Sequence, residues 1–420
     1  MNNKEFKTSA FGTIPSDWSV SLVNEIVEKA QSGGTPKSTE KDYYNGNIPF
    51  LSISDLTIQG KYIRETTKSI TDSGLNESSA WLVPINSIIY SMYASVGFVS
   101  ISKIPLATSQ AMLNLIIKDG FDVEYIYYYL DQIRGKLKKY ISTGTQGNLN
   151  AKTVRSFEIA YPSLSEQQKI SQILSTQDFL IGEYGQLLKL LSKRRLGLEK
   201  QLFSKEIRFK DFTKNNKKID PKNHPTWEWT SKHICKVVDR IKKPFSPEPE
   251  TLYREIGIRS HCKGIFHKEE VTGASLGNKS VFWIQPDCFV VNIVFAWEHA
   301  IAKTTEAEVG MIASHRFPMY KPKKGILDLD YLLYYFKTAR GKHLLGLASP
   351  GGAGRNKTLG QGEFAKLKIP VPSLAEQKRI VSVLSEADRE IELLKQQIAT
   401  LKEQKKGLMQ KLLTGEIRTI

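Results

Sequence analysis

The most regular pattern of apolar residues in this chain lies near its end. Between Ile380 and Leu412, apolar side chains recur at alternating intervals of four and three residues, and Lys405 is the single interruption. This spacing is typical of an α-helix that packs along a continuous seam against a second helix. The pair Ser373 and Glu376 precedes the pattern with the S-x-x-E spacing of a capping box. The pattern therefore predicts a long, capped helix that needs a helical partner.

The same pattern occurs 210 positions earlier. The sequence PSLSEQQKI at Pro162–Ile170 matches PSLAEQKRI at Pro372–Ile380, and the residues that follow align without insertion or deletion. The basic interruption recurs as Arg195, and a polar residue in a seam costs stability but can fix register or orientation. The match favours two helices that pack on each other over two unrelated amphipathic helices, each on its own domain. The predicted seam consists of Ile170, Leu174, Ile181, Leu188, Leu191, Leu198, Ile380, Leu384, Ile391, Leu394, Ile398, Leu401 and Leu408.

The connection between the two copies bears on the direction of the helices. Each helix of about 40 residues would be roughly 60 Å long, whereas the polar linker Lys210–Asn223 reaches at most about 48 Å when extended. A parallel pair would require the chain to return along the whole length before the second domain, so we expect an antiparallel pair. Gly415 and the loss of periodicity near Ser204 mark the expected helix ends.

A variable globular stretch precedes each helix. Segments rich in β-branched and aromatic residues, such as GNIPFLSIS and CFVVNIVFAW, predict strands, and VEYIYYYLDQIRGKLKKYI and LDYLLYYFKTARGKHLL each predict one amphipathic helix. We therefore predict an α+β protein with two mixed α/β domains in tandem, separated by two long helices that form an antiparallel, pseudo-twofold coiled coil. The expected parts are a first domain (1–162), a central helix (163–208), a linker (209–223), a second domain (224–372) and a C-terminal helix (373–420).

The composition narrows the functional classes. The net charge of +17 favours a polyanionic partner such as nucleic acid, although many proteins are basic for no specific reason. A signal peptide and an apolar stretch long enough to span a membrane are both lacking, and the three cysteines show no CxxC spacing. We expect a cytoplasmic protein without a membrane partner.

Gly-rich loops are the candidate contacts to nucleic acid. The loops SGGTPK (Ser32–Lys37), TGTQGNLN (Thr143–Asn150) and SPGGAGRNK (Ser349–Lys357) combine flexible backbone with hydroxyl, amide and basic side chains. Such groups bind phosphates, and Gln, Asn and Arg side chains can read base edges. The alternative is that these loops are ordinary turns.

Catalytic patterns are missing from the sequence. It has no GxxxxGK, HExxH or GxSxG motif. His261, Cys262 and His267 make a poor metal site without further ligands, and the spacing of Asp287, Glu298 and Glu363 does not indicate a nuclease. We therefore expect no catalytic and no metal site. An enzyme with an unrecognised nuclease site and a coiled-coil scaffold without a DNA role remain as alternatives.

The order of motifs resembles the specificity subunits of type I restriction-modification systems over essentially the whole chain. The matching pieces are IPSDW, SGGTPK, YYNGNIPFLSISDL, SMYASVGFVSI, TSQAMLNLI and GTQGNLNAKTVRSFEIAYPSLSEQQKI in the first half, and HKEEVTG, FAWEHAIA and IPVPSLAEQKRIVSVLSEAD in the second. Two places depart from the family pattern, which more often has a basic residue at Phe98 and a more basic run at His261–Gly264.

The resemblance implies a non-catalytic DNA-recognition subunit. Each domain would read one half of a split double-stranded target, the helices would set the gap and dock two methyltransferase subunits, and restriction (motor) subunits would join the complex. S-adenosylmethionine, ATP and Mg would belong to those partners, and this chain would need no cofactor. A related type IIB/IIG-like system is the nearest alternative. The candidate DNA contacts are Thr35, Lys37, Ser91, Tyr93, Ser95, Gln110, Thr145, Gln146, Asn148, Arg259, Lys263, Trp297, His299, His315, Arg316, Arg355, Asn356 and Lys357.

Overall fold

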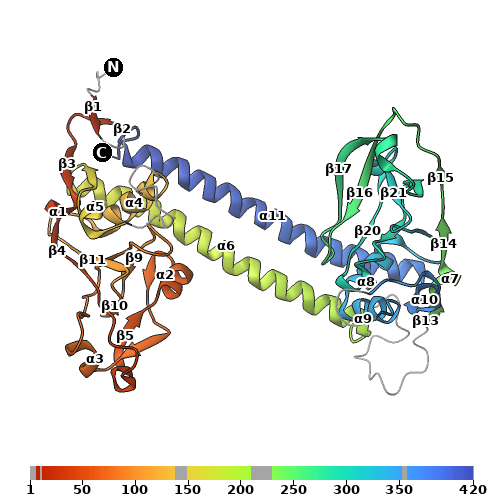
Figure 1. Cartoon of the computed structure of the whole chain (residues 1–420), viewed down its shortest axis with the longest axis horizontal. Coiled ribbons are helices and arrows are strands. Elements are labelled where there is room, and N and C mark those ends of the chain that lie inside the picture. Colours follow the sequence, from red (N-terminus) through yellow and green to blue (C-terminus); the bar gives the residue numbers. More distant parts are fainter. Residues whose placement is uncertain (1–5, 10–11, 138–148, 210–228, 352–356, 420) are drawn as a thin grey trace. The chain divides into compact units, whose positions relative to one another are not determined.

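The computed structural model describes residues 6–9, 12–137, 149–209, 229–351 and 357–419 (Figure 1). The chain divides into two compact units: unit 1 contains residues 1–186 and 396–420, and unit 2 contains residues 187–395. Both boundaries fall inside the two long helices, α6 (Leu164–Ser204) and α11 (Leu374–Leu413). Each unit therefore consists of one globular domain and one end of each long helix. The predicted linker lies outside the described residues except for Phe209.

The domain of unit 1 is built on a five-stranded sheet with the strand order β4-β11-β8-β9-β6. A three-stranded sheet (β10-β5-β7), the pair β3·β12 and the hairpin β1·β2 complete it. The strands are β1 (Phe6–Ser9), β2 (Gly12–Pro15), β3 (Ser19–Leu22), β4 (Val27–Ser32), β5 (Tyr44–Leu51), β6 (Tyr62–Ile63), β7 (Lys68–Ile70), β8 (Ile88–Ser91), β9 (Val99–Ser102), β10 (Ala107–Thr108), β11 (Met112–Ile117) and β12 (Glu158–Tyr161). The helices of this domain are α1 (Val23–Ile26), η1 (Lys41–Tyr43), α2 (Ile53–Gln59), α3 (Asp72–Asn76), α4 (Val123–Arg134) and α5 (Ala151–Arg155).

The domain of unit 2 repeats this topology with different surroundings. Its four-stranded sheet β14-β22-β19-β20 has the connectivity of β4-β11-β8-β9, and the pair β13·β23 corresponds to β3·β12. A separate five-stranded sheet has the order β15-β18-β21-β16-β17. The strands are β13 (Thr230–His233), β14 (Val238–Ile241), β15 (Pro244–Phe245), β16 (Leu252–Ile258), β17 (Ile265–Thr272), β18 (Val281–Trp283), β19 (Phe289–Val291), β20 (Ile301–Lys303), β21 (Ile312–Ser314), β22 (Met319–Pro322) and β23 (Lys368–Val371). Its helices are α7 (Ile234–Val237), η4 (Gly273–Leu276), η5 (Ala296–Glu298), η6 (Glu306–Glu308), α8 (Leu329–Lys337), α9 (Ala339–Leu347) and α10 (Gln361–Lys366).

One of the two predicted amphipathic helices is interrupted. The first is found as α4, but the segment predicted as one helix at 329–345 forms α8 and α9, which meet at Thr338. The Thr338 backbone is extended (φ −67°, ψ 161°) and its hydroxyl accepts a hydrogen bond from Gly341 N at 3.0 Å. Thr338 therefore caps the start of α9, and the prediction of one continuous helix was wrong because threonine is a strong N-cap residue.

The two long helices pack antiparallel, as each unit shows independently. In unit 1, Asp178 in the first half of α6 pairs with Lys405 near the end of α11, with Oδ1 and Nζ 2.5 Å apart. In unit 2, Arg195 near the end of α6 pairs with Asp388 in the first half of α11, with Nε and Oδ1 2.8 Å apart. All thirteen predicted seam residues are buried or half-buried. The ends of both helices extend into the cores of the domains, through residues such as Ile170 in unit 1 and Ile380 in unit 2.

Each basic residue that interrupts a seam lies in a cluster with an aspartate of the opposite helix and a tyrosine of the adjoining domain. The hydroxyl of Tyr128 on α4 donates to Asp178 Oδ2 at 2.7 Å, and the hydroxyl of Tyr334 on α8 donates to Asp388 Oδ2 at 2.8 Å. Each aspartate thus accepts from a tyrosine of the domain and from a cation of the opposite helix. Burial and the neighbouring aspartate raise the pKa of both tyrosines, so the phenols remain neutral donors.

The repeated PSLSEQ and PSLAEQ segments bind each domain to its helix. The side chain of Gln167 accepts from Asp122 N at 3.0 Å and donates to Pro162 O at 3.0 Å. Gln377 makes the equivalent bonds to Asp328 N (2.8 Å) and Pro372 O (2.9 Å). Both glutamines are buried, so these residues are structural in each copy.

The predicted capping boxes are only half formed. Ser163 and Ser373 accept from the backbone N of Glu166 and Glu376 at 3.4 and 3.3 Å, but the two glutamates bind arginines instead of the serine backbone. The buried Glu376 carboxylate accepts two bonds from Arg208, at 2.8 and 2.7 Å.

The equivalent arginine in unit 1 belongs to the end of the chain. Arg418 donates to both carboxylate oxygens of Glu166, each at 2.8 Å, and also binds Asp17. Gly415, with φ +71°, makes the turn after α11, and a Cβ added there would lie 2.5 Å from the Pro15 side chain. The last residues of the chain therefore close the N-terminal domain, which the sequence pattern alone did not indicate.

We expect the ion pair between Arg195 and Asp388 to be energetically coupled. A double-mutant cycle with Arg195→Met and Asp388→Asn should give a coupling of about 1–2 kcal/mol in the free energy of unfolding, measured by urea denaturation. The adjacent pair Arg194–Glu390 is the matched control, because its side chains are 55% and 46% exposed against 13% for Arg195. Its coupling should be about 0.5 kcal/mol or less. Equal couplings for the two pairs would contradict the structural role of the seam site.

Candidate nucleic-acid interface

In unit 1, three loops lie together at one end of β4, β11 and β8, which are neighbours in the five-stranded sheet. Gly33 N donates to Met112 O (3.1 Å) and Gly34 N donates to Thr108 O (2.9 Å). A Cβ on Gly33 would lie 2.0 Å from Thr108 O, so the SGGTPK loop needs glycine for close packing of two backbones. This packing brings Thr35 to Gln110, whose Oε1 accepts from the Thr35 hydroxyl at 2.6 Å.

The third loop follows β8 and carries Tyr93, which is 40% exposed. Met92 N donates to Ala111 O at 2.8 Å, which joins this loop to the turn at 109–111. The hydroxyl of buried Ser91 donates to Tyr93 O at 2.9 Å and so supports the loop from within. Thr35, Lys37, Tyr93 and Gln110 are exposed, so the three loops present hydroxyl, amide and basic groups on one surface.

Unit 2 uses the same backbone arrangement. Ile293 N donates to Arg316 O at 3.0 Å, and the equivalent bond in unit 1 runs from Met92 N to Ala111 O. Phe317 N donates to Ser314 O at 3.0 Å, and the equivalent bond in unit 1 runs from Met112 N to Ser109 O at 3.1 Å. We call the turns 109–111 and 314–316 the recognition turns. They carry Ser-Gln-Ala in unit 1 and Ser-His-Arg in unit 2, so an equivalent backbone presents different side chains.

The hairpin β16–β17 brings a second group of predicted residues together in unit 2. At its tip, His261 N and Cys262 N donate to Glu298 O (2.8 Å) and His299 O (2.9 Å), so the tip packs on η5. Arg259 and Lys263 are exposed on this tip. Next to it, the Lys357 ammonium lies 5.8 Å from the ring centroid of Trp297 on η5.

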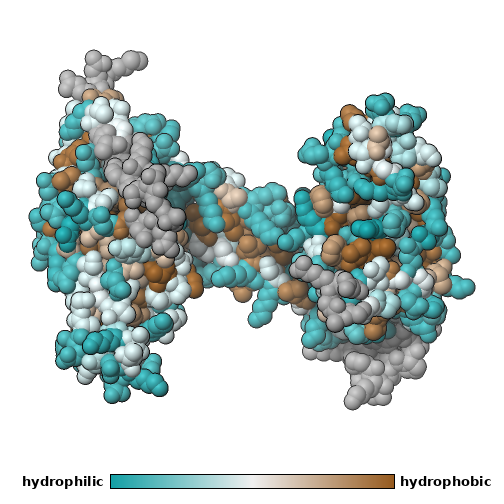
Figure 2. All heavy atoms as spheres, viewed as in Figure 1, coloured by the Kyte–Doolittle hydropathy of each residue, from teal (hydrophilic) through white to brown (hydrophobic). Residues whose placement is uncertain are grey.

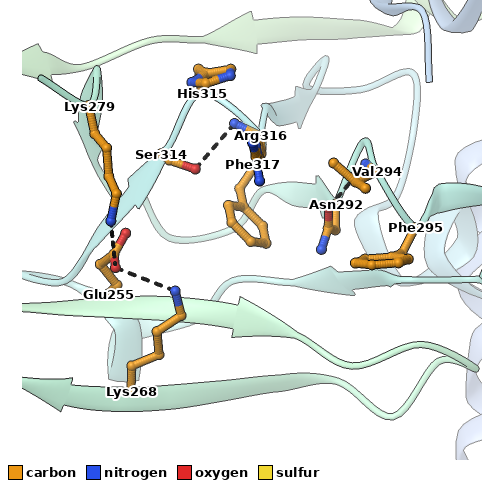
Figure 3. A pocket seen from close by; sticks show the side chains of 10 residues that line it. All are labelled: Glu255, Lys268, Lys279, Asn292, Val294, Phe295, Ser314, His315, Arg316 and Phe317. Atoms are coloured by element: carbon orange, nitrogen blue, oxygen red, sulfur yellow. Dashed lines mark hydrogen bonds and ion pairs between the residues drawn. The ribbon is translucent and has the colours of Figure 1, made fainter. Parts of the chain in front are cut away.

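A cavity of about 370 Å³ lies between the hairpin and the recognition turn of unit 2 (Figure 3). The picture shows Glu255, Lys268 and Lys279 toward one side of it and Asn292 and Phe295 toward the other, with Arg316 between them. Glu255 Oε2 lies 3.4 Å from Lys268 Nζ and 3.9 Å from Lys279 Nζ. The remaining lining residues are Val294, Ser314, His315 and Phe317. The cavity therefore combines cationic, amide and aromatic groups, which suits a base edge beside a phosphate backbone.

The structure places the predicted contact residues in three groups. Thr35, Lys37, Tyr93, Gln110, Arg259, Lys263, His315 and Arg316 are exposed, and Ser95, Trp297 and Lys357 are partly exposed. Ser91 and His299 are buried, so both belong to the framework under the loops and we do not carry them into the proposed contacts. Thr145, Gln146, Asn148, Arg355 and Asn356 lie outside the described residues. Lys268, Lys279 and Asn292 were missed, because the sequence does not tell which strand and loop positions line a cavity.

Backbone strain concentrates in these loops. Of the eight described non-glycine residues with positive φ, four lie here: Ala94, His261, Cys262 and His299. Such conformations are disfavoured for residues with a Cβ and occur preferentially at functional sites.

Within the described ranges, no group of three or more His, Cys, Asp or Glu side chains could hold a metal ion. No described helix is long and apolar enough to cross a membrane.

Comparisons with known proteins agree with the doubled architecture. The family model for the type I restriction modification DNA specificity domain matches residues 15–184 and 287–403. The MjaIX specificity subunit of a type I restriction enzyme of Methanocaldococcus jannaschii is 36% identical over 231 residues, which cover 53% of this chain and 52% of that relative. The chain thus spans about half the length of this relative. The putative MjaX specificity subunit of the same organism is 25% identical over 99% of this chain and 97% of its own length.

Solved structures share the fold. The crystal structure of a type I restriction-modification S subunit from M. genitalium superimposes with a TM-score of 0.55 at 14% identity, over 98% of this chain and 97% of that one. A chain from a structural study of complex assembly in a type I R-M system gives a TM-score of 0.57 at 13% identity, over 96% and 99%. Since the family model covers more than half of the sequence, the chain belongs to the type I restriction-modification DNA specificity family.

His299 should make the stability of unit 2 sensitive to acid. Burial, together with Lys342 and His261, lowers the pKa of His299 to about 4, whereas a histidine in an unfolded chain has a pKa of about 6.5. The unfolded state therefore binds more protons between these values, and stability is lost as the pH falls from about 6.5 toward 4. We expect a loss on the order of 3 kcal/mol by pH 4 that is absent in His299→Asn, measured by urea denaturation at each pH.

Asparagine is the suitable replacement because it tolerates the left-handed backbone of His299, at φ +64°. Above pH 7 the pH dependence of the two proteins should coincide. The same acid dependence in both proteins would show that another group is responsible.

Proposed function

We propose that this chain is the DNA-recognition subunit of a type I restriction-modification complex, in which each unit reads one half of a split double-stranded target. The observation that carries the proposal is the doubling of the interface: the same backbone bonds hold the recognition turn in both units, while the exposed side chains differ. A duplicated scaffold with different loops is suited to two different half-sites. The net charge of +17 supports binding to the phosphate backbone.

The paired helices would set the gap between the half-sites. Each unit holds one end of both helices through its core, its buried glutamine and its glutamate–arginine pair. Because the domains are fixed to the helix ends, the length of the pair would determine the spacing of the two interfaces.

The spacer role can be tested by lengthening both long helices while their apolar seam stays in register. Seven residues are inserted into α6 after Gln186 and seven into α11 before Gln396, where the two units divide. Seven residues preserve the heptad register and add about 10.5 Å at 1.5 Å per residue, or about three base pairs at 3.4 Å each. With the methyltransferase subunits co-expressed, sequencing of methylated adenines should give one bipartite motif for the wild type and the same half-sites about three base pairs further apart for the variant.

The control carries the seven-residue insertion in α6 alone, so that α6 is seven residues longer relative to α11. This variant should methylate DNA more weakly and should not give a motif with a longer, defined gap. An unchanged gap in the double insertion would overturn the role of the helices as a spacer. A wild-type complex without a bipartite motif would overturn the proposed function itself.

Partner subunits have a candidate contact surface on α6. Ile173, Leu180 and Leu187 recur every seven residues and are 36–43% exposed, and Phe179 and Leu190 are 66% and 65% exposed. Figure 2 shows apolar residues on the surface of the long helices. These positions are not needed for the seam, and contiguous exposed apolar side chains commonly mark protein interfaces. We infer that methyltransferase subunits bind here.

Leu190→Asp should weaken this binding and leave the fold intact, because the side chain is 65% exposed. We expect at least about a tenfold loss of affinity for the methyltransferase subunit, measured by titration calorimetry. The adjacent exposed Lys189→Asp is the control, since Lys189 lies outside the apolar line, and it should bind as the wild type does. Equal affinities of both variants and the wild type would exclude this surface.

The chemistry would reside on those partners. We propose that this chain is non-catalytic, that S-adenosylmethionine, ATP and Mg are bound by the methyltransferase and restriction subunits, and that two methyltransferase subunits join each copy. The names of the relatives favour a type I system over a type IIB/IIG-like one. A scaffold without a DNA role would not account for two equivalent loop surfaces with different exposed groups.

A further inference from the structure

We propose that Arg316 reads a guanine in the half-site bound by unit 2, an inference that rests on the proposed function and assigns a specificity residue to it. Four observations carry it: the rigidity of the turn that bears Arg316, its free guanidinium, its position at the cavity, and the side chain at the equivalent position of unit 1.

The recognition turn of unit 2 is fixed by hydrogen bonds at each of its residues. Ser314 O accepts from Phe317 N at 3.0 Å, His315 N donates to Ser280 O at 3.2 Å, and Arg316 O accepts from Ile293 N at 3.0 Å. Arg316 N also lies 3.4 Å from Ser314 Oγ. A side chain on such a turn has its Cα fixed before DNA binds, which reduces the entropy lost on binding.

Arg316 is exposed, and among the described residues its guanidinium has no hydrogen-bond or ion-pair partner. Most neighbouring charges are satisfied: Lys268 and Lys279 both contact Glu255, which itself is only 12% exposed. Arg316 lines the cavity, so its unpaired guanidinium is available to a group that occupies the cavity (Figure 3). Asn292 lies near it with Oδ1 held by Val294 N at 3.1 Å, which orients its amide.

Guanine is the base that matches this group. Arginine donates two parallel hydrogen bonds to O6 and N7 of guanine in the major groove, the commonest specific contact between protein side chains and DNA bases. Adenine offers an acceptor and a donor on the same edge, so it cannot accept both bonds. The planar guanidinium holds two donors in this geometry, whereas the lysine ammonium is a point charge on a flexible stem without a fixed fork.

The equivalent position in unit 1 carries Ala111, whose carbonyl makes the same bond to Met92 N. Its neighbour Gln110 is held by Thr35. Unit 1 therefore lacks the arginine contact, and the two half-sites should differ at the base pair that faces this position. Lys268 and Lys279 differ from Arg316 in role, because both form ion pairs with Glu255. Their ammonium groups are suited to phosphate contacts, which carry no sequence information.

The test compares Arg316→Ala, Arg316→Lys and Lys268→Ala in the complete complex with the methyltransferase subunits. Sequencing of methylated adenines in wild-type cells first gives the motif. Binding is then measured with duplexes that carry this motif and with duplexes in which each base pair of the motif is replaced in turn. In the wild type, replacement of one G·C pair in one half-site should weaken binding about 5- to 150-fold.

In Arg316→Ala that single penalty should disappear, and in Arg316→Lys it should shrink because the fixed fork is lost, while penalties in the other half-site stay. Lys268→Ala should keep every penalty, bind all duplexes more weakly, and lower the salt slope by about one. The lysine variant keeps the charge, so it remains informative if the alanine variant binds too weakly.

Unchanged penalties in both Arg316 variants would overturn the assignment, as would a loss of discrimination at a base pair other than guanine–cytosine. In those cases the wild-type complex would still recognise a bipartite motif. Absence of any such motif in the wild type would instead overturn the proposed function.

Discussion

The architecture depends on two half-buried aspartates, Asp178 and Asp388, each of which joins three elements. A carboxylate removed from water needs compensation, and here a tyrosine of the domain and a cation of the opposite helix supply it. The cations are the same residues that interrupt the apolar seams. If the helices slid by one heptad, each cation would lose its aspartate and each aspartate would lose a partner. The polar interruption thus sets the register of the helices and also their attachment to the domains.

The helical part of the fold was predictable because it rests on local periodicity. The seam spacing, the 210-residue repeat and the short linker together gave the antiparallel pair. What they did not give were interactions that depend on tertiary contacts. The glutamates after the helix starts look like capping-box residues, but Arg208 and Arg418, distant in sequence, bind them more strongly than the serine backbone can. The break at Thr338 was equally hidden, since the apolar period continues across it.

The candidate interface was predictable only in its chemistry. Loops rich in glycine, hydroxyl and basic groups were identified, and many of their residues are exposed on two surfaces. Ser91 and His299 turned out to be buried because strand and turn geometry, not residue type, decides which side chain faces outward. Lys268 and Asn292 were missed for the same reason. The division between buried framework residues and exposed candidate residues therefore required the structure.

The bond between Arg418 and Glu166 has a consequence for the order in which the protein is completed. Unit 2 consists of one continuous stretch, residues 187–395, whereas unit 1 needs residues from both ends of the chain. During translation, every residue of unit 2 is joined to the chain before Arg418 is. The domain that is synthesised first is thus the last to be finished. A chain that stopped between Lys395 and Arg418 would contain every residue of unit 2 but would lack the arginine that pairs with Glu166 in unit 1.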